Sequence, residues 1–516
     1  MTQGPRSWDE TVDVVIVGFG YAGGIAAIEA ADAGAEVLLV EKMPDPGGIS
    51  VCSAGGVRLA LDADEALAYL KATNAGTTPD AVLAVLARGM TMVADQLRCL
   101  AGVSGATVGI REAVGNYPFP GVDTFGFATI DELPGFDAEK AFPQVRGSIF
   151  GARLFKVVAD NVAERRRISV RLATPAKRLV RDGDGAVLGV VLDGPSGERH
   201  VAARRAVVLA TGGFEADGAM QAQFWQIKPV LSAAFRGNTG DGIRMAQAVG
   251  AGLWHMWHFH GSYGFRHPDP GYPFGIRTKR LPDWLPGKGP RGDVRMAWIM
   301  VDQTGRRFAN EYHPYLQDTG HRPMEAFDPE IMRFPRIPAF MIVDDAGRRL
   351  YPLGAPTYND RGVRMSWSRD NEAEVALGLI GRAASVAAVA GAIKVSEAAL
   401  ADTLERWNRA CRDGHDPEFG RAASTMVPIA TPPFYYAPMW PIVSNTQGGP
   451  VHDARQRVLD AFGQVIPKLY AAGELGSVFG HLYMSGGNLA ECFIGGAIAG
   501  REAAAESPVG ERAAAD

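Results

Sequence analysis

A tyrosine and a serine stand just before a glycine pair near the end of the sequence. Tyr483 and Ser485 precede Gly486-Gly487, and the residues that follow have the pattern of a helix. Backbone N–H groups at such a helix start can hold an anionic or electron-rich group. A phenol and a hydroxyl beside that group could exchange a proton with a substrate. Alternatively, Tyr483 is a buried core tyrosine and Ser485 only caps the helix.

A glycine-rich motif near the start of the chain is the second group with chemical potential. Residues 18–23, GFGYAG, lie between a β-branched apolar run and an alanine-rich helical segment. In this strand–turn–helix pattern, glycines let a pyrophosphate approach backbone N–H groups. Glu41 ends the next predicted strand, where a carboxylate accepts hydrogen bonds from ribose hydroxyls. An acid there fits FAD or NAD and disfavours NADP, and a purely structural glycine turn is the alternative.

Further predicted elements must position these groups. Residues 206–213, AVVLATGG, and 469–474, LYAAGE, each have the pattern of a buried strand that ends in small residues and a turn. Residues 80–101 and 371–413 are predicted to be mostly helical, and residues 102–146 to be loop because they are rich in glycine, proline and aromatic residues. The succession of strand and helix patterns predicts an α/β fold that begins with a Rossmann-like unit.

Composition limits the class of protein. The chain has 516 residues and a formal net charge of −5, which predicts two or three domains and gives no sign of nucleic-acid binding. Its four cysteines are widely spread without a CxxC pair, which argues against iron–sulfur, zinc-ribbon and c-type haem sites. Residues 1–13 lack a secretory-signal pattern, and the longest apolar stretch, around 383–393, is too short to span a bilayer. We expect a soluble, cytoplasmic protein without a transmembrane segment or a metal site.

Six segments in family order resemble the fumarate reductase/succinate dehydrogenase flavoprotein family over nearly the whole chain. They are GGISVCSAGG (47–56), NTGDG (238–242), IMVDQTGRRFANE (299–311), WNRACRDGHDPEFGR (407–421), TQGGP (446–450) and YAAGE followed by GGN (470–488). The resemblance implies an α/β fold with a discontinuous Rossmann-like FAD-binding domain, residues 1–257 and 441–516. An α+β capping domain, residues 258–440, would be inserted between these parts, with the isoalloxazine ring of FAD at the interface.

The resemblance also implies which residues hold FAD. Glu474 would contact the ribityl chain, and Asn488 and Leu489, at the start of the last helix, would donate hydrogen bonds to the flavin. Ser50 and Ser53 are candidate hydroxyl contacts, although each could equally form a local turn hydrogen bond. The complete predicted set is Gly18, Gly20, Ala22, Gly23, Glu41, Lys42, Gly48, Ser50, Ser53, Gly55, Gly56, Ala176, Thr211, Gly212, Asp241, Glu474, Asn488 and Leu489.

The chain departs from the family at four informative positions. The histidine that carries covalent FAD in some members is replaced by Ile49, which predicts non-covalent FAD. Three cationic positions that bind dicarboxylates are occupied by Tyr315, Met484 and Asn445. A dicarboxylate without those cations would keep desolvated, unpaired charges at a cost of several kcal/mol each. A dicarboxylate substrate is therefore not expected.

The neutral replacements are similar to those of another branch of the family. The run Tyr483-Met484-Ser485-Gly486 resembles the Tyr-x-Ser-Gly of 3-ketosteroid Δ4-(5α)-dehydrogenases. The resemblance implies catalytic roles for Tyr483, Ser485 and a second tyrosine, for which Tyr315 and Tyr312 compete. It implies an FAD-dependent oxidoreductase that desaturates or reduces a carbon–carbon bond next to a neutral ketone, such as a 3-ketosteroid or a smaller cyclic ketone. Hydride would pass to or from flavin N(5), and a separate donor or acceptor would exchange electrons with the protein.

Two other functions stay open from the sequence alone. One is a fumarate reductase-like enzyme for an unsaturated carboxylate, with Arg277, Arg280 or Arg306 supplying positive charge. The other is a flavin electron-transfer subunit without a substrate of its own.

Two further segments bear on the substrate. Residues 255–267 hold four histidines at a spacing that suits no closed zinc site. We expect this segment to line an apolar pocket, with His258 and His260 as secondary catalytic candidates. Tyr117, Phe119 and Trp440 are expected to add aromatic surface for a flat substrate. The basic segment 275–293 is predicted to be a solvated loop, with a lid or docking surface as the alternative.

Overall fold

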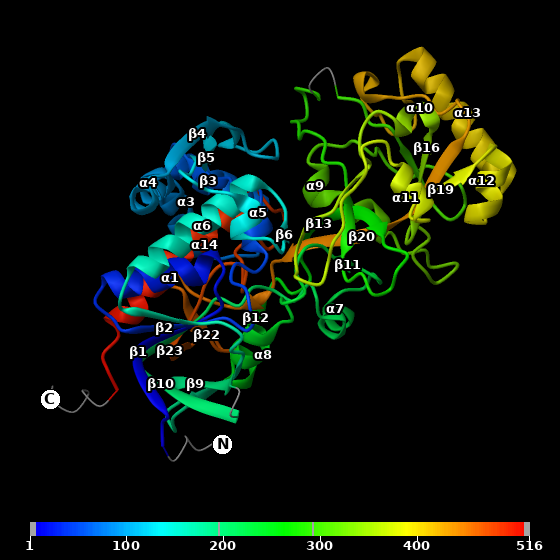
Figure 1. Cartoon of the computed structure of the whole chain (residues 1–516). Coiled ribbons are helices and arrows are strands. Elements are labelled where there is room, and N and C mark those ends of the chain that lie inside the picture. The colour runs from blue at the N-terminus through cyan, green and yellow to red at the C-terminus, as the bar shows by residue number, and fades with distance from the viewer. Residues whose placement is uncertain (1–6, 195–196, 291–293, 510–516) are drawn as a thin grey trace.

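The computed structural model describes residues 7–194, 197–290 and 294–509, which form two lobes joined along one side (Figure 1). The chain builds the first lobe, crosses into the second and returns to the first for its last strands and helix. Residues 1–6, at the start of the segment predicted to lack a signal, and residues 510–516 lie outside the described residues. Within the described ranges, none of the helices combines the length and apolar character needed to cross a bilayer.

The first lobe is built on a mostly parallel sheet. Its strand order is β22-β23-β10-β1-β2-β7, in which all neighbours except β22 and β23 are parallel. Val14, Val15 and Ile16 are fully buried, as expected for a parallel strand covered on both faces. The strands are β1 (Glu10–Val17), β2 (Val37–Val40), β7 (Ile168–Arg171), β8 (Ala176–Arg181), β9 (Val187–Gly194), β10 (Gly197–Leu209), β22 (Arg457–Leu459) and β23 (Val465–Ala471).

Helices cover this sheet on both faces. The long helices α1 (Tyr21–Asp32), α6 (Ile149–Glu164) and α14 (Gly487–Ala505) lie together above it in Figure 1, and α7 (Gly218–Phe224) and α8 (Asp241–Ala248) lie to its right. The backbones of α1 and α14 approach closely because glycines of α14 face α1. A Cβ on Gly500 would lie 2.3 Å from the carbonyl oxygen of Ala26. This packing fixes the position of the N-terminus of α14.

A smaller layer of the first lobe corrects one prediction. Residues 102–146, predicted to be loop, contain β4 (Thr107–Glu112), β5 (Phe125–Glu132) and the short β6 (Val145–Arg146). Strand β5 pairs with β4 and with β3 (Val57–Ala60). The apolar signal of β4 is weak because most of its residues are exposed. The helices of this region are α2 (Ala63–Asn74), α3 (Asp80–Met90), α4 (Val93–Ser104) and α5 (Ala138–Ala141), and α3 and α4 confirm the helical prediction for 80–101.

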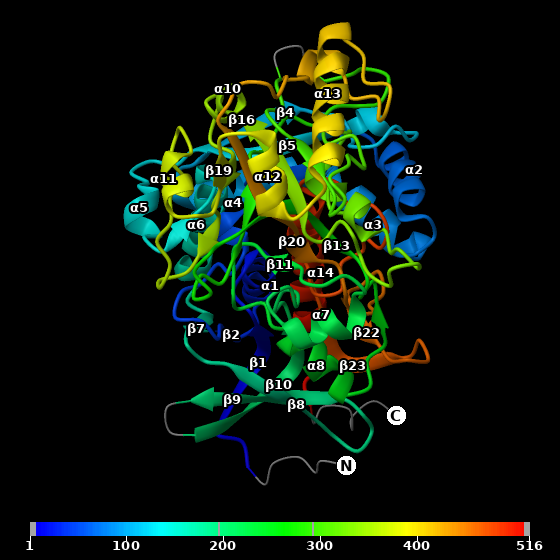
Figure 2. The ribbon, with the colours of Figure 1, turned by 90° about the vertical axis from the view of Figure 1, so that its right-hand side faces the viewer.

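The second lobe is organised around another sheet, of which Figure 2 labels β11, β13, β16, β19 and β20. Its strand order is β15-β16-β20-β13-β14-β17, and β11 and β19 also pair with β20. Its strands are β11 (Leu231–Ser232), β13 (Phe259–Arg266), β14 (Gly275–Thr278), β15 (Ile299–Val301), β16 (Ala339–Asp344), β17 (Gly354–Ala355), β19 (Gly381–Ala383) and β20 (Phe434–Thr446). Its helices are α9 (Leu316–Thr319), α10 (Asp345–Arg348), α11 (Glu372–Ala376), α12 (Val386–Ile393) and α13 (Glu397–Asp413). Two short strand pairs, β6 with β18 (Tyr358–Asn359) and β12 (Leu253–Trp254) with β21 (Gly449–Pro450), complete the fold. The domain boundaries at 257 and 440 stay a prediction.

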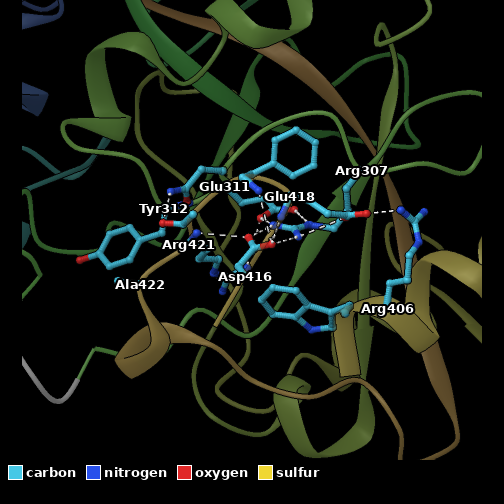
Figure 3. Close-up of polar contacts among 12 residues, drawn as sticks. Arg307, Glu311, Tyr312, Arg406, Asp416, Glu418, Arg421 and Ala422 are labelled. Atoms are coloured by element: carbon cyan, nitrogen blue, oxygen red, sulfur yellow. Dashed lines mark hydrogen bonds and ion pairs between the residues drawn. The ribbon is translucent and has the colours of Figure 1, made fainter. Parts of the chain in front are cut away.

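A buried ion-pair network holds the second lobe together. Arg307 donates to both oxygens of Glu311, at 2.9 and 2.8 Å, and to both oxygens of Asp416, at 3.2 and 3.1 Å (Figure 3). Arg421 donates to the carbonyl oxygens of Trp298 and Met296 and lies 3.4 Å from Glu311. Each of these charged side chains is at least 99% buried. The network fixes the end of the segment 299–311, from which the chain runs directly to Tyr315.

We predict that Arg307→Met destabilises the protein strongly. The substitution leaves Glu311 and Asp416 buried without their shared cation, which should lower the free energy of unfolding by about 3–5 kcal/mol. Urea unfolding followed by circular dichroism measures the loss. Arg409→Met is the matched control, because Arg409 forms an exposed pair with Glu405 that should contribute less than about 1 kcal/mol. Equal effects of the two substitutions would contradict the assigned role of the network.

Candidate functional site

A cavity of about 680 Å³ lies where the two lobes meet. On the first-lobe side, its wall comes from the turns that follow β1, β2, β10 and β23. On the second-lobe side, it comes from β13, β14, β17, β20 and the residues around the start of α9. The beginning of α14 forms a further part of the wall. In α/β proteins, ligands bind in the crevice outside the carboxyl ends of parallel strands, so this is the expected place for a nucleotide cofactor.

The turn after β1 is shaped for close approach of a ligand to the backbone. Gly18 has a φ of +104°, and a Cβ there would lie 2.4 Å from the carbonyl oxygen of Ala210. Glu41 accepts hydrogen bonds from the backbone N–H groups of Phe19, at 3.0 Å, and Met43, at 2.9 Å. Burial raises the pKa of Glu41, and these two N–H groups oppose the shift. The carboxyl group therefore holds the turn in place as well as bordering the cavity.

Most residues of the predicted cofactor set lie in the cavity wall. They are Gly18, Gly20, Ala22, Glu41, Lys42, Gly48, Ser50, Ser53, Gly56, Ala176, Thr211, Gly212, Asp241, Glu474, Asn488 and Leu489. The other two predicted residues, Gly23 and Gly55, are not in the wall. A Cβ on Gly23 would lie 1.8 Å from the carbonyl oxygen of Gly18, and one on Gly55 would lie 2.3 Å from the Phe150 backbone. These two glycines allow the turns around the cavity to pack.

Polar groups that follow β10 and β23 in the cavity wall suit the hydroxyls of a ribityl chain. Buried Thr211 Oγ1 has no hydrogen-bond partner among the described residues. Glu474 accepts from the backbone N–H of Thr446 at 2.9 Å, and Asn238 Nδ2 donates to both Glu215, at 2.7 Å, and Glu474, at 3.3 Å. Burial raises the pKa of both glutamates above the ordinary value. Together with the glycine turn for a diphosphate, these groups fit FAD.

The start of α14 faces the cavity without a side-chain cap. Gly486 is the N-cap residue, with a φ of +75°, and as a glycine it offers no side-chain acceptor to the first-turn N–H groups. The alternative role of Ser485 as a helix cap is therefore wrong, and Ser485 lies in the cavity wall. The side chain of Asn488 is bound to Gln447, Ser477, Glu491 and Asn445. Asn488 can therefore serve a ligand mainly through its backbone, at the positive end of the helix dipole.

Asp318 connects the aromatic groups around the cavity. Its buried carboxylate accepts from His260 Nδ1 at 2.9 Å, from the backbone N–H of Tyr483 at 3.3 Å and from the hydroxyl of Tyr117 in a short hydrogen bond. The His260 ring lies 4.2 Å from the Tyr483 ring, centroid to centroid. The ring of Tyr117 packs edge-on against Tyr315 at 5.3 Å. The Asp318 carboxylate therefore holds Tyr483, in the segment that returns to the first lobe, against the second lobe.

The two tyrosines that competed for one role are separated by the structure. Tyr315 lies in the cavity wall in a left-handed backbone conformation, with φ +57°, and its buried hydroxyl has no partner among the described residues. Tyr312 lies outside the wall, and its hydroxyl donates to the carbonyl oxygen of Pro282 at 2.6 Å. Burial raises the pKa of Tyr315 and Tyr483, so both phenols are protonated at neutral pH.

The expected aromatic lining is wrong in part. The cavity wall does not include Tyr117, Phe119 or Trp440. The hydroxyl of Tyr117 donates instead to Asp318 and to the carbonyl oxygen of Tyr483. Of the histidine-rich segment, His260 reaches the cavity. The Nδ1–H of His258 donates to the carbonyl oxygen of Phe479, 2.7 Å away, and burial lowers the pKa of His258 to about 3. His258 is therefore a structural residue.

Comparison with known proteins identifies the family. The FAD binding domain family matches residues 13–489, most of the chain. The chain belongs to that family. "Fumarate reductase (cytochrome)" from Shewanella frigidimarina is 28% identical, over 96% of this chain and 77% of the relative. "3-Oxosteroid 1-dehydrogenase" from Mycolicibacterium smegmatis is 27% identical, over 96% of this chain and 97% of the relative.

A solved structure shows the same fold. The 3-ketosteroid delta1-dehydrogenase of Sterolibacterium denitrificans superposes with a TM-score of 0.78 at 24% identity, over 96% of this chain and 100% of that chain. These findings confirm the fumarate reductase/succinate dehydrogenase flavoprotein family, with its ketosteroid dehydrogenase-like branch, and FAD as the cofactor. The protein is an FAD-dependent oxidoreductase.

Several residues of this flavoprotein's cavity escaped the sequence analysis. Ser262, Thr278 and Gln317 lie in the cavity wall. Asp318 lies outside the wall and accepts a hydrogen bond from the backbone N–H of Tyr483. The segment 275–293 is not only a solvated loop, since its first residues form β14 and place Arg277 in the wall. Ile276 and Thr278, two β-branched residues at alternate positions, are the signal that could have found this strand. The other residues of the wall are brought together by pairing between strands that are far apart in the sequence.

We predict that acid releases all of the flavin. Ile49 lies in the cavity wall where covalent relatives carry histidine, and its side chain has no atom that could form a bond to FAD. Precipitation with trichloroacetic acid should leave a colourless pellet and a supernatant with one equivalent of FAD per chain, quantified by chromatography. Flavin that stays on the washed pellet would contradict the prediction.

We predict that the Glu215–Glu474 pair makes stability depend on pH. The folded-state pKa of each group is raised above the unfolded value, so the stabilisation is present at low pH and is lost as the pH rises through the folded pKa. The thermal midpoint should fall between about pH 5 and about pH 8, and Glu474→Gln should flatten this slope. Glu405→Gln, on the exposed face of α13, is the control. An unchanged slope in Glu474→Gln would remove the pair as the cause.

Proposed function

We propose that this flavoprotein desaturates or reduces a carbon–carbon bond next to a ketone. The observation that carries the proposal is the pair of buried phenols, Tyr315 and Tyr483, in the cavity wall beside the start of α14. Bound FAD would supply the chemistry of hydride transfer. Neutral hydrogen-bond donors at this position suit a carbonyl oxygen on which negative charge builds up during the reaction.

Tyr483 is suited to polarise the carbonyl group. Its phenol is protonated because burial raises its pKa, so it can donate a hydrogen bond at neutral pH. The backbone N–H groups of Asn488 and Gly486 lie close enough to its oxygen to lower the pKa in part. The His260 ring packs against the phenol, and Asp318 holds the backbone. The donor is therefore preorganised at the helix start.

Tyr315, which is protonated at neutral pH, is suited to donate a proton to the neighbouring carbon in a reduction; in a desaturation its phenolate form would accept that proton. Its hydroxyl points to no protein acceptor among the described residues, so a substrate is free to supply the partner. Its left-handed backbone is a strained conformation of the kind that clusters at active sites. Ser485 lies in the same wall and adds a second hydroxyl. These roles do not distinguish oxidation from reduction, and we propose that a separate donor or acceptor exchanges electrons with the enzyme.

The relatives support two substrate classes. One relative is named for 3-oxosteroids, which supports a cyclic ketone as the substrate. Another is named for fumarate, which supports an unsaturated carboxylate as the second candidate. Arg277 and Arg280 in the wall favour that second candidate, whereas Tyr315, Met484 and Asn445 at the cationic positions of the family favour the ketone.

We predict that ketones change the redox state of the bound flavin. In anaerobic absorbance measurements, a saturated cyclic ketone should bleach the oxidised protein if it is a dehydrogenase. An enone should reoxidise the dithionite-reduced protein if it is a reductase. Tyr483→Phe should slow either reaction by about 10²–10⁴-fold without loss of FAD, because it removes the donor to the carbonyl oxygen.

Tyr312→Phe is the matched control, because that hydroxyl lies outside the cavity wall and should leave the rate nearly unchanged. A normal rate in Tyr483→Phe would remove this tyrosine from the reaction. A flavin that responds to fumarate but to no ketone or enone would contradict the proposed function itself.

A further inference from the structure

We propose that Arg277 forms an anion-binding subsite in the cavity and that the substrate is a carbonyl compound that also carries a carboxylate. The inference rests on the proposed function of the same cavity and adds the substrate class. The ketone would lie at the Tyr315 and Tyr483 end, and the acid group would pair with Arg277 on β14. Such an oxo acid combines the ketone group of the first substrate candidate with the carboxylate group of the second.

Arg277 lies in a wall that offers it no protein partner. It stands on β14, where it pairs with Gly264 on β13 and Ala355 on β17, two small residues that leave room for its side chain. Its Nε is buried and forms no hydrogen bond, and the guanidinium makes no ion pair within the described residues. Burial and, to a smaller extent, nearby Arg280 lower its pKa to about 10, yet the group remains a cation at neutral pH.

Two buried arginines, Arg58 and Arg307, use all of their guanidinium nitrogens. Arg58 donates from Nε and both terminal nitrogens, to Ser485 O at 2.8 Å, Val114 O at 3.1 Å and Asn116 Oδ1 at 3.2 Å. Arg307 likewise uses all three nitrogens on two carboxylates. A desolvated cation without such partners destabilises the protein unless a ligand supplies them. The contrast indicates that the partner of Arg277 comes from a bound molecule.

The charge balance of the wall points to an anion. Within the described residues, the second lobe contributes no Asp or Glu to the cavity wall, whereas it contributes Arg277 and Arg280. The nearest acid to Arg280 is Asp283, at 3.6 Å. Both arginines lower the pKa of His260, after the larger effect of burial, so their positive field reaches the ring that packs on Tyr483. An anionic group on the substrate would therefore orient the carbonyl end toward the tyrosines.

The position of Arg277 also argues against a role in holding the diphosphate of FAD. The glycine turn at residues 18–23 follows β1 in the first lobe, whereas Arg277 stands on a strand of the second lobe. A planar carboxylate fits a guanidinium through two parallel hydrogen bonds, which gives orientation as well as affinity. The FAD content of Arg277 variants separates the two roles.

The test uses the FAD-loaded protein and matched pairs of small cyclic ketones. The probes are 3-oxocyclohexanecarboxylate, 4-oxocyclohexanecarboxylate and their methyl esters, with Kd measured from the perturbation of the flavin absorbance spectrum. We expect at least one acid to bind about 10–100-fold more tightly than its ester, as a hydrogen-bonded charge pair implies. Arg277→Met should bring this ratio close to one while the FAD content stays unchanged.

Arg306→Met is the control, because Arg306 is exposed and outside the cavity wall. It should keep the preference for the acid. Equal affinity of acid and ester in the unmodified protein, or an undiminished preference in Arg277→Met, would overturn the inference. Loss of FAD from both Arg277→Met and Arg277→Lys would overturn it as well, in favour of a cofactor role.

The outcome separates the inference from the proposed function. If ketones and their esters change the flavin redox state with no preference for the acid, the inference fails and the proposed function stands. If fumarate changes it and no ketone does, the proposed function fails, and the inference fails with it.

Discussion

The hydrogen bonds of the Asp318 carboxylate join the three parts of the chain that build the cavity. Tyr117 comes from the first lobe, His260 and Asp318 from the second, and Tyr483 from the segment that returns to the first lobe. Burial alone would raise the pKa of this carboxyl group, but hydrogen bonds from His260 and Tyr117 lower it below its ordinary value. An ionised acid with several donors is an effective anchor because each donor would lose a charge-assisted bond on moving away. The placement of the catalytic tyrosine candidates thus depends on contacts between lobes.

Two other sets of contacts hold the segments around Asp318 in place. The ion pairs of Arg307 with Glu311 and Asp416 hold the segment that leads to Tyr315. The close packing of α1 on α14 fixes the helix start that follows Tyr483. Because each tyrosine is supported by a rigid neighbour, the site can hold its hydrogen-bond donors in place before a substrate arrives. Such preorganisation is the main source of transition-state stabilisation in reactions that build charge on a carbonyl oxygen.

The cavity combines neutral and cationic walls. The tyrosine hydroxyls and the start of α14 offer hydrogen bonds without a full charge, whereas β14 offers an unpaired guanidinium. A site for a fully apolar ketone would gain nothing from an unpaired cation, and a site for a dicarboxylate would use more than one at the reacting end. The arrangement fits the proposed substrate with one acid group held away from the reacting carbons.

Local sequence patterns were sufficient to predict the cofactor side of the cavity. The glycine turn at 18–23, Glu41 and the strand ends near Thr211 and Glu474 are local patterns, and parallel strands must bring their carboxyl ends to one edge of a sheet. Local patterns also sufficed for α3 and α4, but not for β4, whose exposed residues lack an apolar alternation. Only the tertiary structure decided which tyrosine faces the cavity, since Tyr312 and Tyr315 differ by three residues and point to different partners. It also decided that Asp318 and Arg277 belong to the site, because strand pairing and burial between segments far apart in the sequence place them there. Local periodicity carries no information about such long-range contacts, so the substrate side depended on the fold.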